Sequence, residues 1–211
     1  LDAHELTRWF FMSLGAAAPD GICRPFDKNR TGTVLRNSYA AMIVEREDEA
    51  KKRGANILCY VEDVRNRNDA GHPMAPADDG KAYRMALESL MKDKDITYDD
   101  IDYVNAHATG TPRGDEIELN TLKDYLPKGT TVSALKGHIG HAMGACSLAE
   151  ITYTCMMMNK GIALHTANLK DPCDDYFDLI TKPKEMQINY ALKNSFGFGG
   201  RSSVALISKA D

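Results

Sequence analysis

Three short motifs, each placed directly after a short apolar segment, constrain the fold of this chain most strongly. They are residues 105–112 (NAHATGTP), residues 136–145 (KGHIGHAMGA) and residues 194–200 (NSFGFGG). The apolar segments before them are rich in the β-branched and aromatic residues typical of strands. Open α/β sheets place their ligand sites where a strand ends and a loop begins, so each of the three motifs stands at a position typical of a ligand site.

Helical periodicity alternates with these apolar segments along the chain. It predicts helices over residues 6–14, 47–53, 81–92, 115–126 and 142–159. Strands are predicted over residues 33–45, 57–64, 101–105, 131–134, 190–195 and 202–208. The segment 142–159 is apolar on nearly all sides, which is typical of a buried helix. This alternation predicts an α/β fold with a central sheet.

Length and composition narrow the class of protein. The 211 residues are 43% hydrophobic and 27% charged, enough for one core or for one half of a duplicated fold. A net charge of -4 without a basic stripe argues against a nucleic-acid partner. The apolar runs are too short to span a membrane, and no signal peptide is visible, so we expect a cytoplasmic protein. Leu1 is not a natural initiator, which places the expected start upstream.

The cysteines favour a reducing compartment. Their number is odd and none form a CxxC pair, so we expect free thiols and neither a disulfide framework nor a zinc site. They are Cys23, Cys59, Cys146, Cys155 and Cys173. Cys23 lies near Pro25 and could be reactive, but a partly exposed, unreactive loop thiol is the favoured interpretation.

The first motif offers His107 as a hydrogen-bond donor. A neutral imidazole after a strand can stabilise an oxygen on which negative charge develops. Thr109 and Thr111 offer hydroxyls that could bind a polar substrate chain. The alternative is that all three side chains bond only to the local backbone. Asp115 and Glu116 suit the positive end of a helix dipole.

The second motif places His141 at the expected start of the apolar helix, where the helix dipole favours a neutral imidazole. Lys136 can supply fixed positive charge, and Gly140 and Gly144 allow close backbone approach. A metal site on His138 and His141 is disfavoured because no third ligand stands at helical spacing.

The third motif is expected to join two adjacent strands. Its glycines leave backbone N–H groups free to face an anion, and an aromatic side chain beside them could act as a gate. The alternative is an ordinary hairpin turn. A dinucleotide fingerprint is excluded because no helix follows the loop.

Together and in this order, the three motifs resemble the C-terminal half of a β-ketoacyl synthase. Residues 24–27 with 30–32, and residues 49–55, also resemble segments of that family. The resemblance implies a thiolase-like fold of five αβαβα layers, built from two similar halves and usually dimeric. It divides this chain into a linker segment, residues 1–32, and a C-terminal synthase domain, residues 33–211.

The resemblance also implies site residues and partners. His107 and His141 would bind the malonyl thioester oxygen and stabilise the enolate, with Lys136 and Glu118 as a supporting charged pair. The loop residues Phe196, Phe198 and Gly199 would form the oxyanion and gating region, and Thr109 and Thr111 would hold pantetheine. No metal and no other cofactor is expected, because the substrates are carried on the phosphopantetheine of an acyl carrier protein.

The chain departs from the family pattern in two ways. Residues 36–41 (RNSYAA), Ile139 and Arg201 replace glycine-rich or threonine positions, which suggests a divergent branch with an altered acyl pocket or partner surface. None of the five cysteines stands in the context of the family nucleophile. The resemblance therefore implies a cysteine-bearing N-terminal half, in the same or a separate chain, and a tight homodimer or heterodimer.

Three functions remain open at this point. The leading one is the malonyl-binding half of a condensing enzyme of fatty-acid or polyketide elongation, an acyltransferase. The second is a non-catalytic chain-length or scaffold subunit, which would have no need of His107, His141 and Lys136. The third is a thiolase, against which the paired histidines and the glycine–phenylalanine loop count.

Overall fold

The computed structural model describes residues 5–73 and 76–210. Its centre is a six-stranded sheet in the order β1-β8-β7-β2-β3-β5. The strands are β1 (Cys59–Asn68), β8 (Arg201–Lys209), β7 (Tyr190–Gly197), β2 (Tyr103–Asn105), β3 (Thr131–Ser133) and β5 (Asp178–Leu179). The pairs β1/β8 and β8/β7 are antiparallel, and the pairs β7/β2, β2/β3 and β3/β5 are parallel. This mixed sheet confirms the predicted α/β fold.

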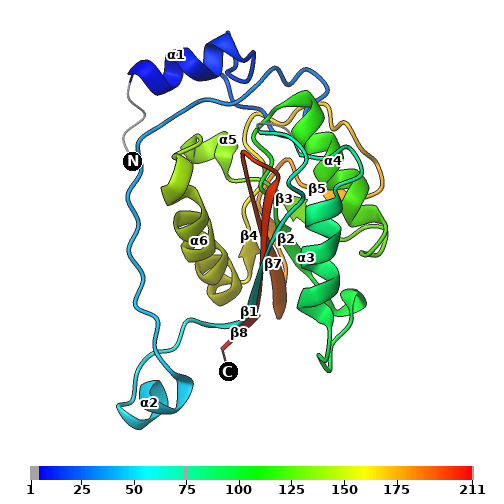
Figure 1. Ribbon diagram of the computed structural model, residues 1–211. Coiled ribbons are helices and arrows are strands. Elements are labelled where there is room, and N and C mark those ends of the chain that lie inside the picture. Colours follow the sequence, from blue (N-terminus) through cyan, green and yellow to red (C-terminus); the bar gives the residue numbers. More distant parts are fainter. Residues whose placement is uncertain (1–4, 74–75, 211) are drawn as a thin grey trace.

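Helices cover both faces of the sheet (Figure 1). The helices α3 (Lys81–Met91) and α4 (Pro112–Lys123) lie on one face, and α6 (Cys146–Lys160) lies on the other. Neighbouring residues of β2 serve the two faces, because side chains alternate along a strand. Val104 belongs to the core that includes Leu87 of α3 and Leu122 of α4, whereas Tyr103 packs in the core that includes Met158 of α6.

The remaining elements are short or peripheral. They are α1 (Glu5–Ser13), α2 (Glu47–Lys52), α5 (Lys136–Ile139), the 3-10 turns η1 (Tyr98–Asp100) and η2 (Met143–Ala145), and the two-stranded sheet of β4 (Ile162–Ala163) and β6 (Lys184–Glu185). None of the helices in the described ranges is long and apolar enough to span a membrane.

Local signals explain most of the element ends. Pro112 begins α4 three residues before the predicted start, since its fixed φ suits the first helical position. Gly161, with a φ of 66°, ends α6 where the sequence predicts. The predicted loop between the last two strands is the hairpin turn between β7 and β8.

The predicted buried strand over residues 33–45 is wrong. Only Thr33 and Leu35 form isolated bridges, to Ala17 and His141, and residues 36–46 have no regular secondary structure. Ile43 and Val44 are 89% and 71% exposed. Their apolar, β-branched pattern is that of a strand, but in the described structure residues 37–46 join neither sheet and run as an extended arm, visible along the left of Figure 1.

Two expectations about cysteines also need correction. Cys59, the first residue of β1, forms a disulfide with Cys155 of α6, and their Cα atoms lie 5.7 Å apart. The two cysteines meet because the edge strand β1 and the helix α6 both pack against the same core. Sequence patterns do not indicate this contact, because the two residues are 96 positions apart. Cys23 is buried, not partly exposed, because the loop that carries it packs against the turn at Thr109.

Candidate active site

The three motifs lie together, because each follows or ends one of the neighbouring parallel strands β2, β3 and β7. The ring centroids of His107 and His141 are 5.7 Å apart and the rings are nearly perpendicular. The ring of Phe196, near the end of β7, lies 5.2 Å from that of His107. One residue from each motif thus contributes to a single cluster.

Glu118 holds the first and third motifs in place. Its carboxylate, fully buried on α4, accepts hydrogen bonds from the backbone N–H groups of His107 and Ala108, both at 2.8 Å. The side-chain amide of Asn194 donates to the same carboxylate at 2.9 Å. Burial raises the pKa of Glu118, although these hydrogen bonds oppose the shift. Glu118 therefore orients the backbone at His107 rather than forming the predicted ion pair with Lys136.

The partner of Lys136 is Glu150, on α6. The Lys136 ammonium lies 2.7 Å from one carboxylate oxygen of Glu150, and both side chains are buried. A second buried ammonium, from Lys193 of β7, lies 2.9 Å from the other oxygen. Two cations therefore share one anion near the histidine pair. Neither Glu150 nor Lys193 was expected from sequence, although a lysine within the apolar strand segment 190–195 is a signal that could have identified Lys193.

Burial and mutual attraction shift the pKa values of Lys136, Glu150 and Lys193. Burial alone disfavours the ionised form of each member, but the two ammonium groups outweigh it at Glu150 and lower the pKa of that carboxyl. At Lys136 the attraction of Glu150 outweighs burial and raises the pKa. At Lys193 burial prevails and, with repulsion from Lys136, lowers the pKa.

Both histidines are held as neutral imidazoles. Burial, followed by repulsion from Lys136, lowers the pKa of His141 to about 3. The same two causes, in the same order, lower the pKa of His107. The sequence predicts a neutral His141 from a helix dipole, but α6 begins only at Cys146, five residues later, so the main physical cause is burial. A neutral imidazole keeps one N–H, so the pair offers two donors to an oxygen.

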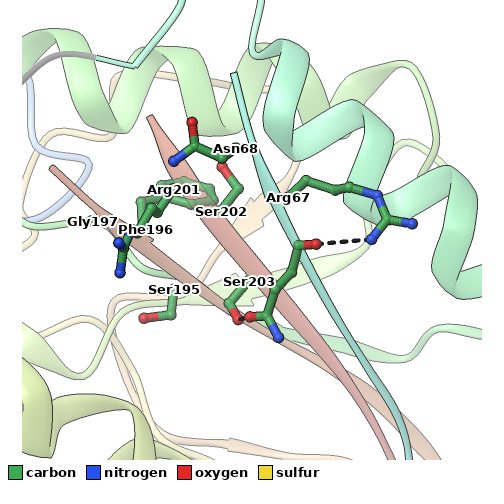
Figure 2. A pocket seen from close by; sticks show the side chains of 9 residues that line it. Arg67, Asn68, Ser195, Phe196, Gly197, Arg201, Ser202 and Ser203 are labelled. Carbon is green, nitrogen blue, oxygen red and sulfur yellow. Dashed lines mark hydrogen bonds between the residues drawn. The ribbon is translucent and has the colours of Figure 1, made fainter. Parts of the chain in front are cut away.

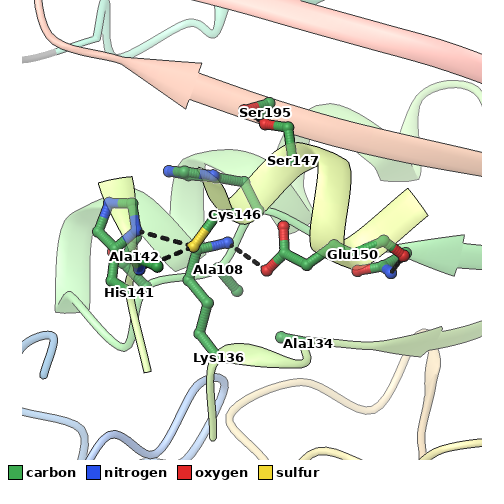
Figure 3. Close-up of polar contacts among 12 residues, drawn as sticks. Ala108, Ala134, Lys136, His141, Ala142, Cys146, Ser147, Glu150 and Ser195 are labelled. Carbon is green, nitrogen blue, oxygen red and sulfur yellow. Dashed lines mark hydrogen bonds and ion pairs between the residues drawn. The ribbon is translucent and has the colours of Figure 1, made fainter. Parts of the chain in front are cut away.

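His141 is fixed by the chain on either side of it. Its backbone N–H donates to Val34 at 2.8 Å, and its carbonyl accepts from Arg36 at 3.2 Å. Its Nδ1 lies 3.3 Å from the sulfur of Cys146, as Figure 3 shows. By contrast, Nδ1 of His107 is buried and makes no hydrogen bond within the described structure.

The two phenylalanines of the third motif have different neighbours. Phe196 packs between His107 and Tyr83, whose ring centroid is 4.8 Å away. Phe198 lies in the hairpin turn, is 45% exposed and stacks on Phe11 of α1 at 5.4 Å. Gly199 follows with a φ of 80°, a backbone conformation that favours glycine. Of these predicted residues, Phe196 is the one whose ring contacts the histidine pair.

The predicted threonines lie beside His107 at the entry to α4. Their hydroxyl oxygens, Oγ1 of Thr109 and of Thr111, are 3.1 Å apart. Asp115 shapes this turn: its buried carboxylate accepts from the backbone of Gly110 at 3.1 Å and of Phe26 at 2.9 Å. Asp115 therefore does more than interact with the helix dipole, because its hydrogen bonds connect the first motif to the loop that contains Phe26.

His138 lies apart from the histidine pair. Its Nε2 is 2.7 Å from the backbone oxygen of His165, and the two rings are in contact. Within the described residues, no group of three or more His, Cys, Asp or Glu side chains could hold a metal ion.

An open pocket of about 580 Å³ lies where the third motif meets the edge strand β1. Its lining includes Ser195, Phe196 and Arg201, together with Arg67 of β1, and Figure 2 shows the two arginines pointing to different sides. Neither histidine lines it, but Phe196 is common to the pocket and the histidine pair.

Comparisons with known proteins agree with this geometry. Residues 58–170 match the family model described as "Beta-ketoacyl synthase, C-terminal domain". The chain is 34% identical to the mitochondrial 3-oxoacyl-[acyl-carrier-protein] synthase of Arabidopsis thaliana and 35% identical to 3-oxoacyl-[acyl-carrier-protein] synthase 2 of Vibrio harveyi. These alignments cover 91% and 90% of this chain but only 43% and 48% of the relatives, so the chain spans less than half their length.

Solved structures give the same result for the fold. The ishigamide ketosynthase/chain length factor superposes with a TM-score of 0.88 at 27% identity, covering 98% of this chain and 51% of that one. A β-ketoacyl synthase from Burkholderia phymatum superposes with a TM-score of 0.85 at 26% identity, covering 99% and 52%. The fold is thus that of ketosynthases, with this chain corresponding to the C-terminal half.

Proposed function

Because this chain belongs to the β-ketoacyl synthase family, we propose that it supplies the malonyl-binding half of a decarboxylative condensation. The single observation that carries the proposal is the pair of neutral imidazoles, His107 and His141, with ring centroids 5.7 Å apart in the segments that follow the parallel strands β2 and β3. The substrates would be a malonyl thioester on an acyl carrier protein and an acyl thioester on an enzyme cysteine.

In the proposed reaction both histidines donate N–H hydrogen bonds to the malonyl thioester oxygen. The bond between the carboxylate and the α-carbon breaks, CO₂ leaves, and its bonding electrons form an enolate whose oxygen the two donors stabilise. The enolate carbon then attacks the acyl thioester on cysteine. A carbon–carbon bond forms, and the cysteine sulfur leaves as thiolate.

The charged group near the histidines favours this chemistry through preorganisation. Lys136 lies near both rings and disfavours imidazolium, so the N–H donors stay neutral while the charge appears on the substrate. Thr109 and Thr111, beside His107, would receive the pantetheine arm. Phe196 would shape the acyl side of the site, while Phe198 and Gly199 would form a gate at the hairpin turn.

The nucleophile is proposed to come from a cysteine-bearing half outside this chain. Burial raises the pKa of Cys23 to about 12 and also raises the pKa of Cys146 and Cys173. Cys59 and Cys155 are joined to each other. A thiolate nucleophile needs a free thiol of lowered pKa, and none of the three free thiols in the described structure has one.

Two solved complexes support the proposed partners. One is a type II polyketide acyl-carrier protein in complex with its ketosynthase, and it superposes on this chain with a TM-score of 0.84 at 27% identity. The other is the ketosynthase/chain length factor described above. We propose that this chain likewise binds an acyl carrier protein and a second synthase half.

The test is decarboxylation of malonyl-acyl carrier protein by the assembled protein, measured as CO₂ release. His107→Ala and His141→Ala should each lower the rate by about 10²–10³-fold, as expected for loss of an oxyanion donor. His138→Ala, outside the pair, is the matched control and should leave the rate unchanged. Equal activity of all three variants, or none in the wild type, would favour a non-catalytic chain-length or scaffold subunit.

A further inference from the structure

Cys146 contacts a ring nitrogen of the histidine pair. It is the first residue of α6 and only 2% exposed, and its sulfur lies 3.3 Å from Nδ1 of His141. The backbone N–H of Ala142 donates to the same sulfur at 2.9 Å. Figure 3 shows both contacts converging on the sulfur.

The Cys146 thiol can donate one hydrogen bond, and two acceptors lie near its sulfur. Burial raises its pKa, so at neutral pH it carries that hydrogen. The Ala142 N–H already points at the sulfur, which leaves the S–H for Nδ1 of His141 at 3.3 Å or for the carbonyl oxygen of Gly140 at 3.9 Å. The shorter contact is with the imidazole, and a neutral imidazole accepts at one nitrogen only.

We propose that Cys146 is a positioning residue that donates its S–H to Nδ1 of His141 and so holds that imidazole as the Nε2–H tautomer. This inference rests on the proposed function, because an Nε2–H is what a substrate oxygen would need from His141. Its alternative, an Nδ1–H directed at the sulfur, would leave Nε2 without a hydrogen and His141 unable to donate to substrate.

The first experiment measures the tautomer directly and needs no substrate. Long-range ¹H–¹⁵N correlation spectra of ¹⁵N-histidine-labelled protein, in its native assembly, report which ring nitrogen carries the hydrogen. His141→Gln identifies the resonances of His141 by their disappearance. The wild type should show His141 as the Nε2–H form from pH 6 to 8, and an Nδ1–H form would overturn the proposal.

Variants of Cys146 then test the cause. In Cys146→Ala the His141 resonances should move toward a mixture of both tautomers, whereas Cys146→Ser, which keeps a donor, should retain the Nε2–H form. Cys173→Ala, at a half-buried position outside the site, should change nothing. Unchanged His141 resonances in folded Cys146→Ala would also overturn the proposal.

Decarboxylation provides the functional readout. Cys146→Ala should lower kcat about two- to tenfold with little change in KM, the loss expected for one hydrogen bond, and Cys146→Ser should restore most of it. An inactive wild type with the expected tautomer would contradict the proposed function and leave the assignment of Cys146 intact. The two failures are therefore distinguishable.

Discussion

The charge balance of the site depends on the carboxylate of Glu150. It faces two buried ammonium groups, at 2.7 Å and 2.9 Å, and its own side chain is fully buried. Removing such a carboxylate leaves like charges without compensation in a medium of low polarity, where an unpaired charge is costly. Removing one of the two lysines leaves a matched pair.

This asymmetry makes a prediction about stability. Glu150→Gln should lower the free energy of unfolding by about 3–5 kcal/mol, the cost of breaking a buried ion pair from one side. Lys193→Met should cost far less, because Lys136 still neutralises Glu150. Urea denaturation of both variants measures the difference, and equal losses would show that Lys193 is as necessary to the charge balance as Glu150.

The neutral histidines predict how stability depends on pH. In the unfolded chain each imidazole titrates near its ordinary pKa of about 6.5, whereas in the folded state the pKa of His141 is about 3 and that of His107 is also lowered. Between pH 7 and 5 the unfolded chain therefore gains protons that the folded chain does not. The contribution of the two histidines to the free energy of unfolding is therefore fully present above about pH 6.5 and is lost as the pH falls toward 3.

Substitution of His141 tests its share of this pH dependence. His141→Asn should reduce the pH dependence of the unfolding free energy by about one proton over this window. Denaturant titrations at pH 7, 6 and 5 provide the slopes, and an unchanged slope in His141→Asn would contradict a neutral imidazole in the folded state.

At the scale of elements, the turn before His141 depends on close backbone approach. Gly140 has a φ of 72°, and a Cβ there would lie 2.9 Å from the backbone oxygen of Val34 and 2.3 Å from Cγ of Arg36. Val34 also accepts the hydrogen bond from the His141 backbone. The bridge between residues 34–36 and 141 therefore requires glycine at position 140.

Gly54 provides a matched comparison for this turn. It has a similar φ of 70°, but a Cβ there would meet no atom within 4 Å. Gly54→Ala should cost only the backbone strain of about 1–2 kcal/mol, whereas Gly140→Ala should cost more and also displace His141. Thermal unfolding and decarboxylation rates test both, and equal effects of the two substitutions would show that crowding at Gly140 is relieved without moving the histidine.

At the scale of the whole molecule, apolar side chains are exposed on the side of the sheet that α6 covers. Tyr153 and Met156 of α6 are 37% and 51% exposed, although the sequence predicts that this helix is buried on nearly all sides. Ile43 of the extended arm is 89% exposed, and Trp9 of α1 is 69% exposed. Such a surface is typical of a protein–protein interface. The proposed second synthase half would bury it.

If this surface is the interface, placing a lysine in it should weaken the association with the second synthase half. Met156→Lys and Ile43→Lys should each weaken association with the cysteine-bearing half by about tenfold or more, since a lysine would be buried without a partner. Met85→Lys, at a 40% exposed position of α3 on the opposite face of the sheet, is the control. Sedimentation or co-purification measures association, and equal weakening by Met85→Lys would exclude α6 and the arm as the interface.

Sequence patterns determined much of the fold and the histidine pair. Strand ends followed by glycine-rich motifs placed His107 and His141 at one sheet edge, because parallel strands such as β2 and β3 end side by side. Helix ends at Pro112 and Gly161 follow from backbone conformations that depend on one residue. These features are local, so a short stretch of sequence carries the information.

The tertiary structure alone decided the partner of Lys136 and the course of residues 36–46. Glu118 and Glu150 are both acids on helices after motifs, but α4 and α6 lie on opposite faces of the sheet, and periodicity does not say which face a helix covers. The arm has the composition of a strand, yet a strand forms only where another strand pairs with it. Ion pairs, the Cys59–Cys155 disulfide and strand pairing all depend on contacts between distant segments, which only the packed molecule defines.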